Sequence, residues 1–188
     1  MVTERNGRFV RVLGPGIHIL QQYEYVEAVL DTRTQERAEF GVTLYTKDGI
    51  DIKTDIFVPF HIGRGGAEPT QDTPFPYDDG AVRKTGYAEI IIENGHVLNW
   101  ERLPMKVTVE ILREMVSKQP LDRLLYPRGN AELKPHEQIK DELETRTRAE
   151  LKKMGIDLVH IRLSRLEVPE EVTKQRIEFW RAFGRRQQ

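Results

Sequence analysis

Residues 40–62, FGVTLYTKDGIDIKTDIFVPFHI, carry the most regular pattern in the chain and constrain its fold most strongly. Apolar and polar side chains alternate along the second half of this segment, which is the period of a β-strand with one buried face. Asp48-Gly49 precedes that strand and favours a tight hairpin turn, because both positions of such a turn take positive φ angles. Pro59 has no backbone N–H to donate, so it predicts an edge strand or a bulge. The residues expected on the buried face are Ile50, Ile52, Thr54, Ile56, Val58, Phe60 and Ile62.

The N-terminal region contains a second strand signal around Gly14-Pro15-Gly16. Proline presets its φ angle and glycine accepts backbone conformations that other residues avoid, so this tripeptide predicts a sharp turn. The apolar residues on either side predict two short strands bent on each other, at residues 8–13 and 17–20. A further extended segment is expected at residues 26–30.

Helical periodicity replaces this alternation after residue 100. Apolar residues spaced three and four positions apart predict a helix that opens near Trp100 and Pro104 and ends near Lys118, just before Pro120. The composition of residues 63–80 and 126–135, rich in glycine, proline and polar residues, predicts a loop at each end of this region.

A second helix is expected at residues 135–154, where acidic residues come early and basic residues late, as the helix dipole favours. Gly155 ends this helix, residues 156–168 predict a strand, and a last helix is expected from Pro169. Strands that come first and helices that follow indicate an α+β fold rather than a doubly wound sheet.

Length and composition exclude several classes of protein. At 188 residues the chain forms one domain, or one domain with an appendage. Its 29 basic and 30 acidic residues give a net charge of −1, whereas binding to nucleic-acid phosphates normally requires a basic excess. No segment reaches the roughly 18 apolar residues of a membrane span, and the first residues, MVTERNGR, lack the apolar stretch of a signal peptide. Because the chain lacks a basic excess, we expect no nucleic-acid partner.

The sequence offers no candidate for catalysis or ligand binding. The histidines are scattered without metal-ligand spacing, and the absence of cysteine excludes thiolate nucleophiles and cysteine-based zinc sites. Residues 63–66, GRGG, resemble a phosphate loop but lack the Lys-Ser or Lys-Thr that completes one. The adjacent carboxylates Asp78 and Asp79 are expected to form a turn. We therefore expect no catalytic residue, no metal or other cofactor, no small-molecule substrate and no enzymatic activity.

Short motifs along almost the whole chain, from about residue 7 to residue 172, are similar to one protein family when taken in order. The first group surrounds the Gly-Pro-Gly turn and the strands after it: Gly7…Val12-Leu13-Gly14-Pro15-Gly16-Ile17-His18, Val29-Leu30-Asp31-Thr32-Arg33-Thr34-Gln35 and Thr46-Lys47-Asp48-Gly49-Ile50. The second group covers the helices and the last strand: Leu112-Arg113-Glu114 with Leu121-Asp122, Gly155-Ile156, and Leu166-Glu167-Val168-Pro169-Glu170-Glu171-Val172. In combination these motifs resemble the stomatin, prohibitin and flotillin superfamily, also called the SPFH or band-7 domain.

The resemblance implies an α+β domain at residues 1–168, with a small, mostly antiparallel sheet and packed helices. Residues 169–188 would begin a C-terminal helix that serves as a coiled-coil or oligomerisation segment. It further implies a non-enzymatic, membrane-associated scaffold that homo-oligomerises and organises membrane proteins or membrane microdomains, with an AAA protease among the partners in some members. The alternative is a soluble adaptor that regulates a membrane-bound protease or channel. Because the sequence shows no anchor, either the chain is part of a longer protein or it reaches the membrane through a partner.

The resemblance also implies a membrane-proximal site around the Gly-Pro-Gly turn. Apolar residues there are expected to lie against lipid or a neighbouring subunit; the alternative is that they fill the core of the small sheet. This membrane-proximal set is Phe9, Val10, Leu13, Pro15, Ile17, Ile19 and Leu20.

A second candidate site is an interface between copies of the chain. Charged faces of the helix at residues 135–154 and the aromatic terminal helix are expected to dock neighbouring protomers; alternatively, the terminal helix docks on its own domain or at a membrane surface. Glu142 with Arg146, and Glu144 with Arg148, are spaced to pair across one helical turn. This oligomer-interface set is Glu142, Glu144, Arg146, Arg148, Phe179, Trp180 and Phe183.

Overall fold

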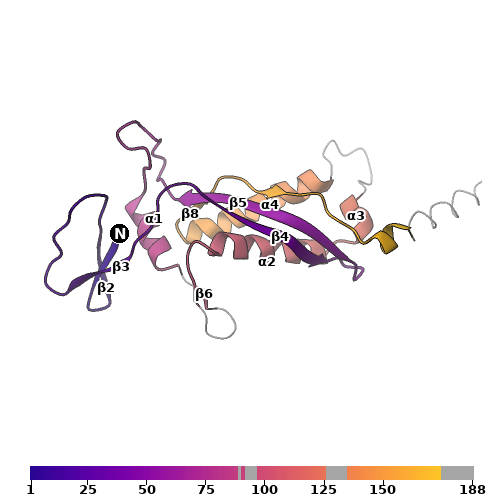
Figure 1. Ribbon diagram of the computed structural model, residues 1–188, viewed down its shortest axis with the longest axis horizontal. Helices are drawn as coiled ribbons and strands as arrows, with labels where there is room; N and C mark the ends of the chain where they lie inside the picture. The colour runs from indigo at the N-terminus through magenta and orange to yellow at the C-terminus, as the bar shows by residue number, and fades with distance from the viewer. Residues whose placement is uncertain (89, 92–96, 126–134, 175–188) are drawn as a thin grey trace, which may run out of the picture.

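The computed structural model describes residues 1–88, 90–91, 97–125 and 135–174 of the chain. The molecule is elongated, with the N-terminal strands at one end of its longest axis and residues 170–174 at the other (Figure 1). Antiparallel sheets dominate the first third of the chain and helices dominate the rest, which confirms the expected α+β class.

Three short strands near the N-terminus form the first sheet, and we call residues 1–30 the N-terminal lobe. β1 (Val2–Arg5) lies between β2 (Arg8–Val12) and β3 (Glu24–Ala28), and both pairings are antiparallel. Asn6 and Gly7 form the β1–β2 turn with φ angles of 53° and 70°, as a two-residue hairpin requires.

The strand that we expected at residues 17–20 is absent. The hairpin turns at Asn6-Gly7 instead of Gly14-Pro15-Gly16, so β2 pairs with the strand before it rather than with the segment after it. β3 occupies the second edge of β1, which leaves no edge of β1 free for residues 17–20. Residues 13–23 consequently form a long surface connection.

The second sheet contains the alternating segment and confirms the expected hairpin. β4 (Gln35–Tyr45) pairs antiparallel with β5 (Asp51–Ile62) through a connection at residues 46–50. Gly49 in this connection has a φ of 76°, but Asp48 does not take the positive φ that we expected at both turn positions. Every second side chain of β5, from Ile52 to Ile62, is buried, as the alternation predicts.

Pro59 lies in the central strand of this sheet and not in an edge strand. β8 (Ile156–Leu158) and β9 (Arg162–Leu163) pair with the side of β5 that β4 leaves free. The Pro59 carbonyl accepts a hydrogen bond of 3.0 Å from the Val159 N–H, so the side of Pro59 that lacks an N–H faces residues 159–161. The single strand expected at residues 156–168 is therefore broken at the point where proline supplies no donor.

Two long helices cover one face of the second sheet, as expected from the periodicity (Figure 1). α2 (Leu103–Ser117) packs on β4 and β5, and α4 (Pro135–Lys153) packs on α2 and β8. α3 (Leu121–Leu125) follows α2 and contacts α4. A separate ribbon of β6 (Ile90–Ile91) and β7 (Val97–Leu98) precedes α2.

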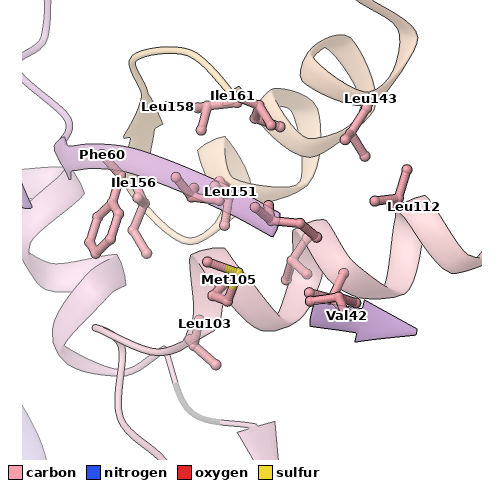
Figure 2. Packing of buried hydrophobic residues seen from close by; sticks show 14 of the residues in the cluster. Val42, Phe60, Leu103, Met105, Leu112, Leu143, Leu151, Ile156, Leu158 and Ile161 are labelled. Atoms are coloured by element: carbon pink, nitrogen blue, oxygen red, sulfur yellow. The ribbon is translucent and has the colours of Figure 1, made fainter. Parts of the chain in front are cut away.

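The main core lies between the second sheet and these helices. Figure 2 shows Phe60 of β5, Leu112 of α2 and Leu143 and Leu151 of α4 among the side chains that fill it. Each of these side chains is almost completely buried. Burying a Leu or Phe side chain contributes about 1.5–3 kcal/mol, so this cluster is a major source of stability.

α1 (Asp79–Gly86) forms where the sequence predicted no helix. The Asp78 carboxylate accepts a hydrogen bond of 2.8 Å from the Ala81 N–H, which caps the helix, and Asp79 lies in its first turn. The two carboxylates thus start a helix rather than forming only a turn. α1 contacts β1, β2 and β5, so it joins the N-terminal lobe to the second sheet.

Candidate functional site

Among the described residues, the most exposed large apolar side chains lie on the connection between β2 and β3, residues 13–23, which we call the apolar loop. Ile17 and Ile19 have exposed fractions of 101% and 90%, and Leu20 and Pro15 are also exposed. Isoleucine is normally among the most buried residue types, and exposed apolar side chains that cluster mark an interaction surface. The apolar loop lies at the end of the molecule that is remote from α3 and from residues 170–174 (Figure 1).

An ion pair between a half-exposed arginine and a buried glutamate holds the base of the apolar loop. Arg11 Nε and Nη2 donate hydrogen bonds of 2.9 and 3.0 Å to the two carboxylate oxygens of Glu24. The Glu24 side chain is fully buried, and Thr3 Oγ1 donates a further hydrogen bond to it. These contacts, above all the hydrogen bonds from Arg11, lower the pKa of Glu24 from 4.5 to about 2. Glu24 is therefore ionised at neutral pH and paired with Arg11.

The same ion pair fixes the backbone of the apolar loop. Arg11 Nη2 donates to the Ile19 carbonyl at 3.1 Å, and the Gln21 N–H donates to Glu24 Oε2 at 2.8 Å. His18 Nε2 lies 2.9 Å from the Gly14 carbonyl oxygen. The polar groups of the loop thus bond within the lobe, whereas Ile17 and Ile19 point into solvent.

A second buried carboxylate joins the lobe to α1. Glu4 of β1 accepts hydrogen bonds from the hydroxyls of Tyr25 on β3 and Tyr87 at the end of α1. Burial and the hydrogen bond to Glu4 raise the pKa of Tyr87 to about 12. The guanidinium of Arg83 on α1 stacks over the ring of Phe9, 4.4 Å from its centroid. The N-terminal lobe therefore packs against α1 through these contacts.

The structure divides the expected membrane-proximal set into an exposed part and a packed part. Pro15, Ile17, Ile19 and Leu20 reach solvent on the apolar loop. Leu13 is only 6% exposed, and Phe9 and Val10 on β2 are half-buried. Phe9 and Val10 are packed because β2 is a strand of the lobe, and Leu13 directly after β2 donates its N–H to the Met1 carbonyl, as the alternative of core packing predicts. Residues 15–20 lie outside every strand.

A groove separates the beginning of the apolar loop from residues 63–78, which we call the proline loop. The groove has a volume of about 850 Å³. At one end Gly14 approaches Tyr77 so closely that a Cβ atom on Gly14 would lie 2.7 Å from the Tyr77 hydroxyl oxygen. The proline loop is therefore packed against the Gly-Pro-Gly turn. The sequence predicted a turn and a loop at these two places but not the contact between them.

The charged residues of α4 serve two different purposes. Glu142 and Arg146 pair at 2.6 Å as expected, on an exposed face. Glu144 and Arg148 do not form the expected pair: Glu144 accepts a hydrogen bond of 2.7 Å from the Ile161 N–H, and Arg148 donates to the Val159 carbonyl at 3.4 Å. Glu144 and Arg148 therefore hold the β8–β9 connection of their own chain.

The remaining members of the expected oligomer-interface set are Phe179, Trp180 and Phe183, and they lie outside the described residues.

Sequence reasoning missed Arg11, Glu24, Glu4 and Tyr87, the residues that fix the candidate site. Each of the four is a common polar residue in a segment without a motif, and its partner is distant in the chain; 83 positions separate Glu4 from Tyr87. The register of β1 between β2 and β3 brings Arg11 and Glu24 together, and the packing of α1 on β1 places Tyr87 beside Glu4. The one local signal is that two charged residues, Arg11 and Glu24, border an apolar segment.

Two searches over the described part of the chain bear on function. No group of three or more His, Cys, Asp or Glu residues there could hold a metal ion. Among the helices that the structure describes, none combines the length and the apolar composition needed to cross a membrane.

Comparison with known proteins identifies the family. The model of the SPFH domain / Band 7 family matches residues 1–187, which is nearly the whole chain. A search of curated proteins gave no match. The family match agrees with the α+β fold that the structure shows. The chain therefore belongs to the SPFH domain / Band 7 family.

Proposed function

We propose that this chain is a non-enzymatic scaffold domain that places its apolar loop against a membrane surface and assembles with copies of itself to organise membrane proteins. Members of the SPFH family are generally membrane-associated scaffolds rather than enzymes. Membrane contact through the apolar loop and self-association are our proposals for this member of the family.

One observation carries the proposal: Ile17 and Ile19 are exposed on a loop whose backbone is fixed by Arg11 and the buried Glu24. A flexible apolar loop could fold back onto its own domain, but this loop is hydrogen-bonded in a conformation that keeps both side chains in water. Keeping these apolar side chains in water is unfavourable. Their free energy falls when the loop enters the boundary between lipid headgroups and acyl chains, because the apolar surface is then removed from water.

The size of the apolar contact explains why assembly belongs to the proposed function. Burying two isoleucine side chains gives about 3–6 kcal/mol before any cost of association. A dissociation constant of about 1 mM already corresponds to about 4 kcal/mol. One copy alone therefore binds a membrane weakly, whereas several loops on one assembly act together and raise the effective affinity by orders of magnitude.

The exposed face of α4 is a candidate lateral contact in such an assembly. Glu142 and Arg146 are about half exposed, and Arg146 lies 3.9 Å from Glu114 of α2. Exposed pairs of this kind contribute only about 0.2–1 kcal/mol each, so they would set the register between copies rather than drive assembly.

Sedimentation with lipid vesicles tests the membrane contact. The full chain is mixed with phosphatidylcholine vesicles, with and without phosphatidylserine, and compared with an Ile17→Ser/Ile19→Ser double variant. We expect the wild type to sediment with both kinds of vesicle and the double variant to lose most of its binding. Val159→Ser is the matched control, because it removes an apolar side chain that is 42% exposed between β8 and β9.

Two results would count against the membrane contact. If the double variant bound vesicles as well as Val159→Ser did, the apolar loop would not be the contact. If the wild type ignored vesicles altogether and remained small, the soluble-adaptor function would be the better account.

A further inference from the structure

The groove between the apolar loop and the proline loop has the chemistry of a binding site for an apolar, basic segment. Most of its surface is apolar, and two carboxylates, Asp72 and Asp79, line it as well. Among the described residues that line it there is no lysine or arginine, and the Met1 amino group donates a hydrogen bond of 2.8 Å to the Leu13 carbonyl. The apolar side chains include Val12, Leu13, Leu30, Phe75, Tyr77 and Val82.

The proline loop presents this groove in a fixed shape. Phe75 stands between Pro74 and Pro76 and is 48% exposed at the groove. Proline fixes its own φ angle and restricts the residue before it, so Pro74-Phe75-Pro76 loses little conformational freedom on binding. A volume of about 850 Å³ lies within the range of roughly 300–1,000 Å³ typical of ligand pockets, which is ample for an aromatic side chain.

The chain itself contains a segment with the complementary chemistry. Residues 175–188, QRIEFWRAFGRRQQ, combine four arginines and one glutamate with Phe179, Trp180 and Phe183. Tryptophan and arginine are the residue types that most often dominate binding energy at protein interfaces, and aromatic residues in general are enriched there. The basic charge of the segment matches the two carboxylates of the groove.

The groove and this segment belong to opposite ends of the molecule. The groove lies where β2 meets α1, and residues 170–174, which lead into the segment, lie at the far end of the longest axis (Figure 1). A contact between two such different surfaces on two copies is heterologous, and it repeats from copy to copy into a ring or an open filament.

We propose that residues 175–188 of one copy bind in the groove between the apolar loop and the proline loop of the next copy. This inference rests on the proposed function, because it names the contact through which the scaffold assembles. It assigns a role to the proline loop, and it places one tail beside each apolar loop in the assembly.

Solution mass measurements on the full chain and two variants test this contact. The groove variant is Asp72→Arg/Phe75→Ser, which changes exposed residues of the proline loop. The tail variant is Trp180→Ser/Phe183→Ser. Phe40→Ser is the control, because Phe40 is 70% exposed on β4, outside the groove. Circular dichroism and thermal unfolding show whether each variant is folded.

We expect the wild type and Phe40→Ser to form assemblies larger than a dimer as concentration rises, and each variant alone to stay at the 21.9 kDa mass of one chain. Mixing the two variants provides the sharper result. The mixture retains one intact groove and one intact tail, so it forms a dimer of twice that mass and nothing larger.

Several outcomes would overturn the inference. A wild type that is monomeric at all concentrations would do so, and so would variants that assemble like the wild type. A mixture that stays monomeric would also do so, because the intact tail of one variant would then not bind the intact groove of the other. A tail variant that loses vesicle binding while the wild type is monomeric would assign the tail to the membrane.

The vesicle assay separates this inference from the proposed function. A wild type that binds vesicles without assembling removes the head-to-tail contact and leaves the membrane contact in place. A wild type that assembles through groove and tail but ignores vesicles supports the head-to-tail contact and removes the membrane contact.

Discussion

The guanidinium of Arg11 makes a two-point ion pair with the fully buried carboxylate of Glu24, at 2.9 and 3.0 Å, across the base of a loop whose isoleucines face solvent. The carboxylate of Glu24 is thus buried under a half-exposed arginine, while the apolar side chains of the loop stay in solvent. In most proteins polar residues cover an apolar core. Here a buried carboxylate fixes a loop whose apolar side chains are exposed.

Arg11→Ala should destabilise the lobe and release the apolar loop. The substitution leaves the Glu24 carboxylate buried without its cation, which is strongly unfavourable. We expect a lower Tm, faster amide hydrogen exchange across residues 13–23 and weaker vesicle binding. Arg33→Ala is the matched control, because Arg33 pairs with Asp31 at the surface and such pairs contribute little. Equal Tm values for the two variants would contradict the role that we assign to Arg11.

The stability of the chain should fall in acid through Glu24. Its pKa is about 2 in the folded state and 4.5 ordinarily, so the folded state favours the ionised form. The stabilisation is complete above the unfolded-state pKa of 4.5 and is lost as pH falls from there through about 2. Urea unfolding between pH 2 and 7 measures this loss, and Glu24→Gln should show a smaller dependence on pH over the same range. A wild type and a variant with parallel pH profiles would rule out this contribution.

Two glycines with the same backbone conformation should respond differently to alanine. Gly49 and Gly155 have φ angles of 76° and 78°, so a Cβ atom adds about 1–2 kcal/mol of strain at either position. A Cβ on Gly49 meets nothing within 4 Å, whereas a Cβ on Gly155 would overlap the backbone of Ala81 in α1. We expect Gly155→Ala to cost more than about 3 kcal/mol of unfolding free energy and Gly49→Ala to cost about 1–2. Equal costs in chemical denaturation would show that α1 does not pack on the α4–β8 turn.

Thr147→Val should stabilise the protein. Thr147 is completely buried in α4, and its hydroxyl has no hydrogen-bond partner in the part of the chain that the structure describes. An unsatisfied buried hydroxyl costs about 1–3 kcal/mol, so replacing it with a methyl group of similar shape should raise the unfolding free energy by about 1 kcal/mol. Thr108→Val is the control, because the buried Thr108 hydroxyl donates to the Pro104 carbonyl at 2.7 Å. The prediction fails if Thr147→Val is the more destabilised of the two.

The sequence predicted those parts of the fold that depend on neighbours in the chain. The burial of β5 from Ile52 to Ile62 follows from alternation alone, and Asp48-Gly49 specifies its turn locally. The long helices α2 and α4 are predictable for the same reason, because each repeats its apolar spacing over several turns.

The parts that were predicted wrongly or missed depend on distant partners. Whether residues 17–20 form a strand is decided by β1, which pairs on both sides with β2 and β3 and leaves no edge for them. The break at residues 159–161 depends on Pro59, about a hundred positions earlier in the chain. α1 is only eight residues long, so its buried residues Ala81, Val82 and Thr85 do not repeat over enough turns to show a clear apolar stripe.

The sequence predicted where the candidate site lies, but not the contacts that fix it. The Gly-Pro-Gly turn and the isoleucines after it indicated residues 14–20. The Arg11–Glu24 pair fixes the loop that exposes those isoleucines, and the only local sign of it is that the two charged residues border the apolar segment. The packed position of Leu13 likewise follows from the lobe as a whole, because its N–H donates to the Met1 carbonyl at 2.8 Å.

The most direct test of the account places a reporter on the apolar loop. The chain contains no cysteine, so Ile17→Cys creates a unique site for an environment-sensitive fluorophore, and Val159→Cys provides the control. On adding vesicles, we predict a blue shift at position 17 and quenching there by quenchers attached to lipid, with neither effect at position 159. A label at position 17 that stays in water while the protein sediments with the vesicles would contradict the claim that the apolar loop is the membrane contact.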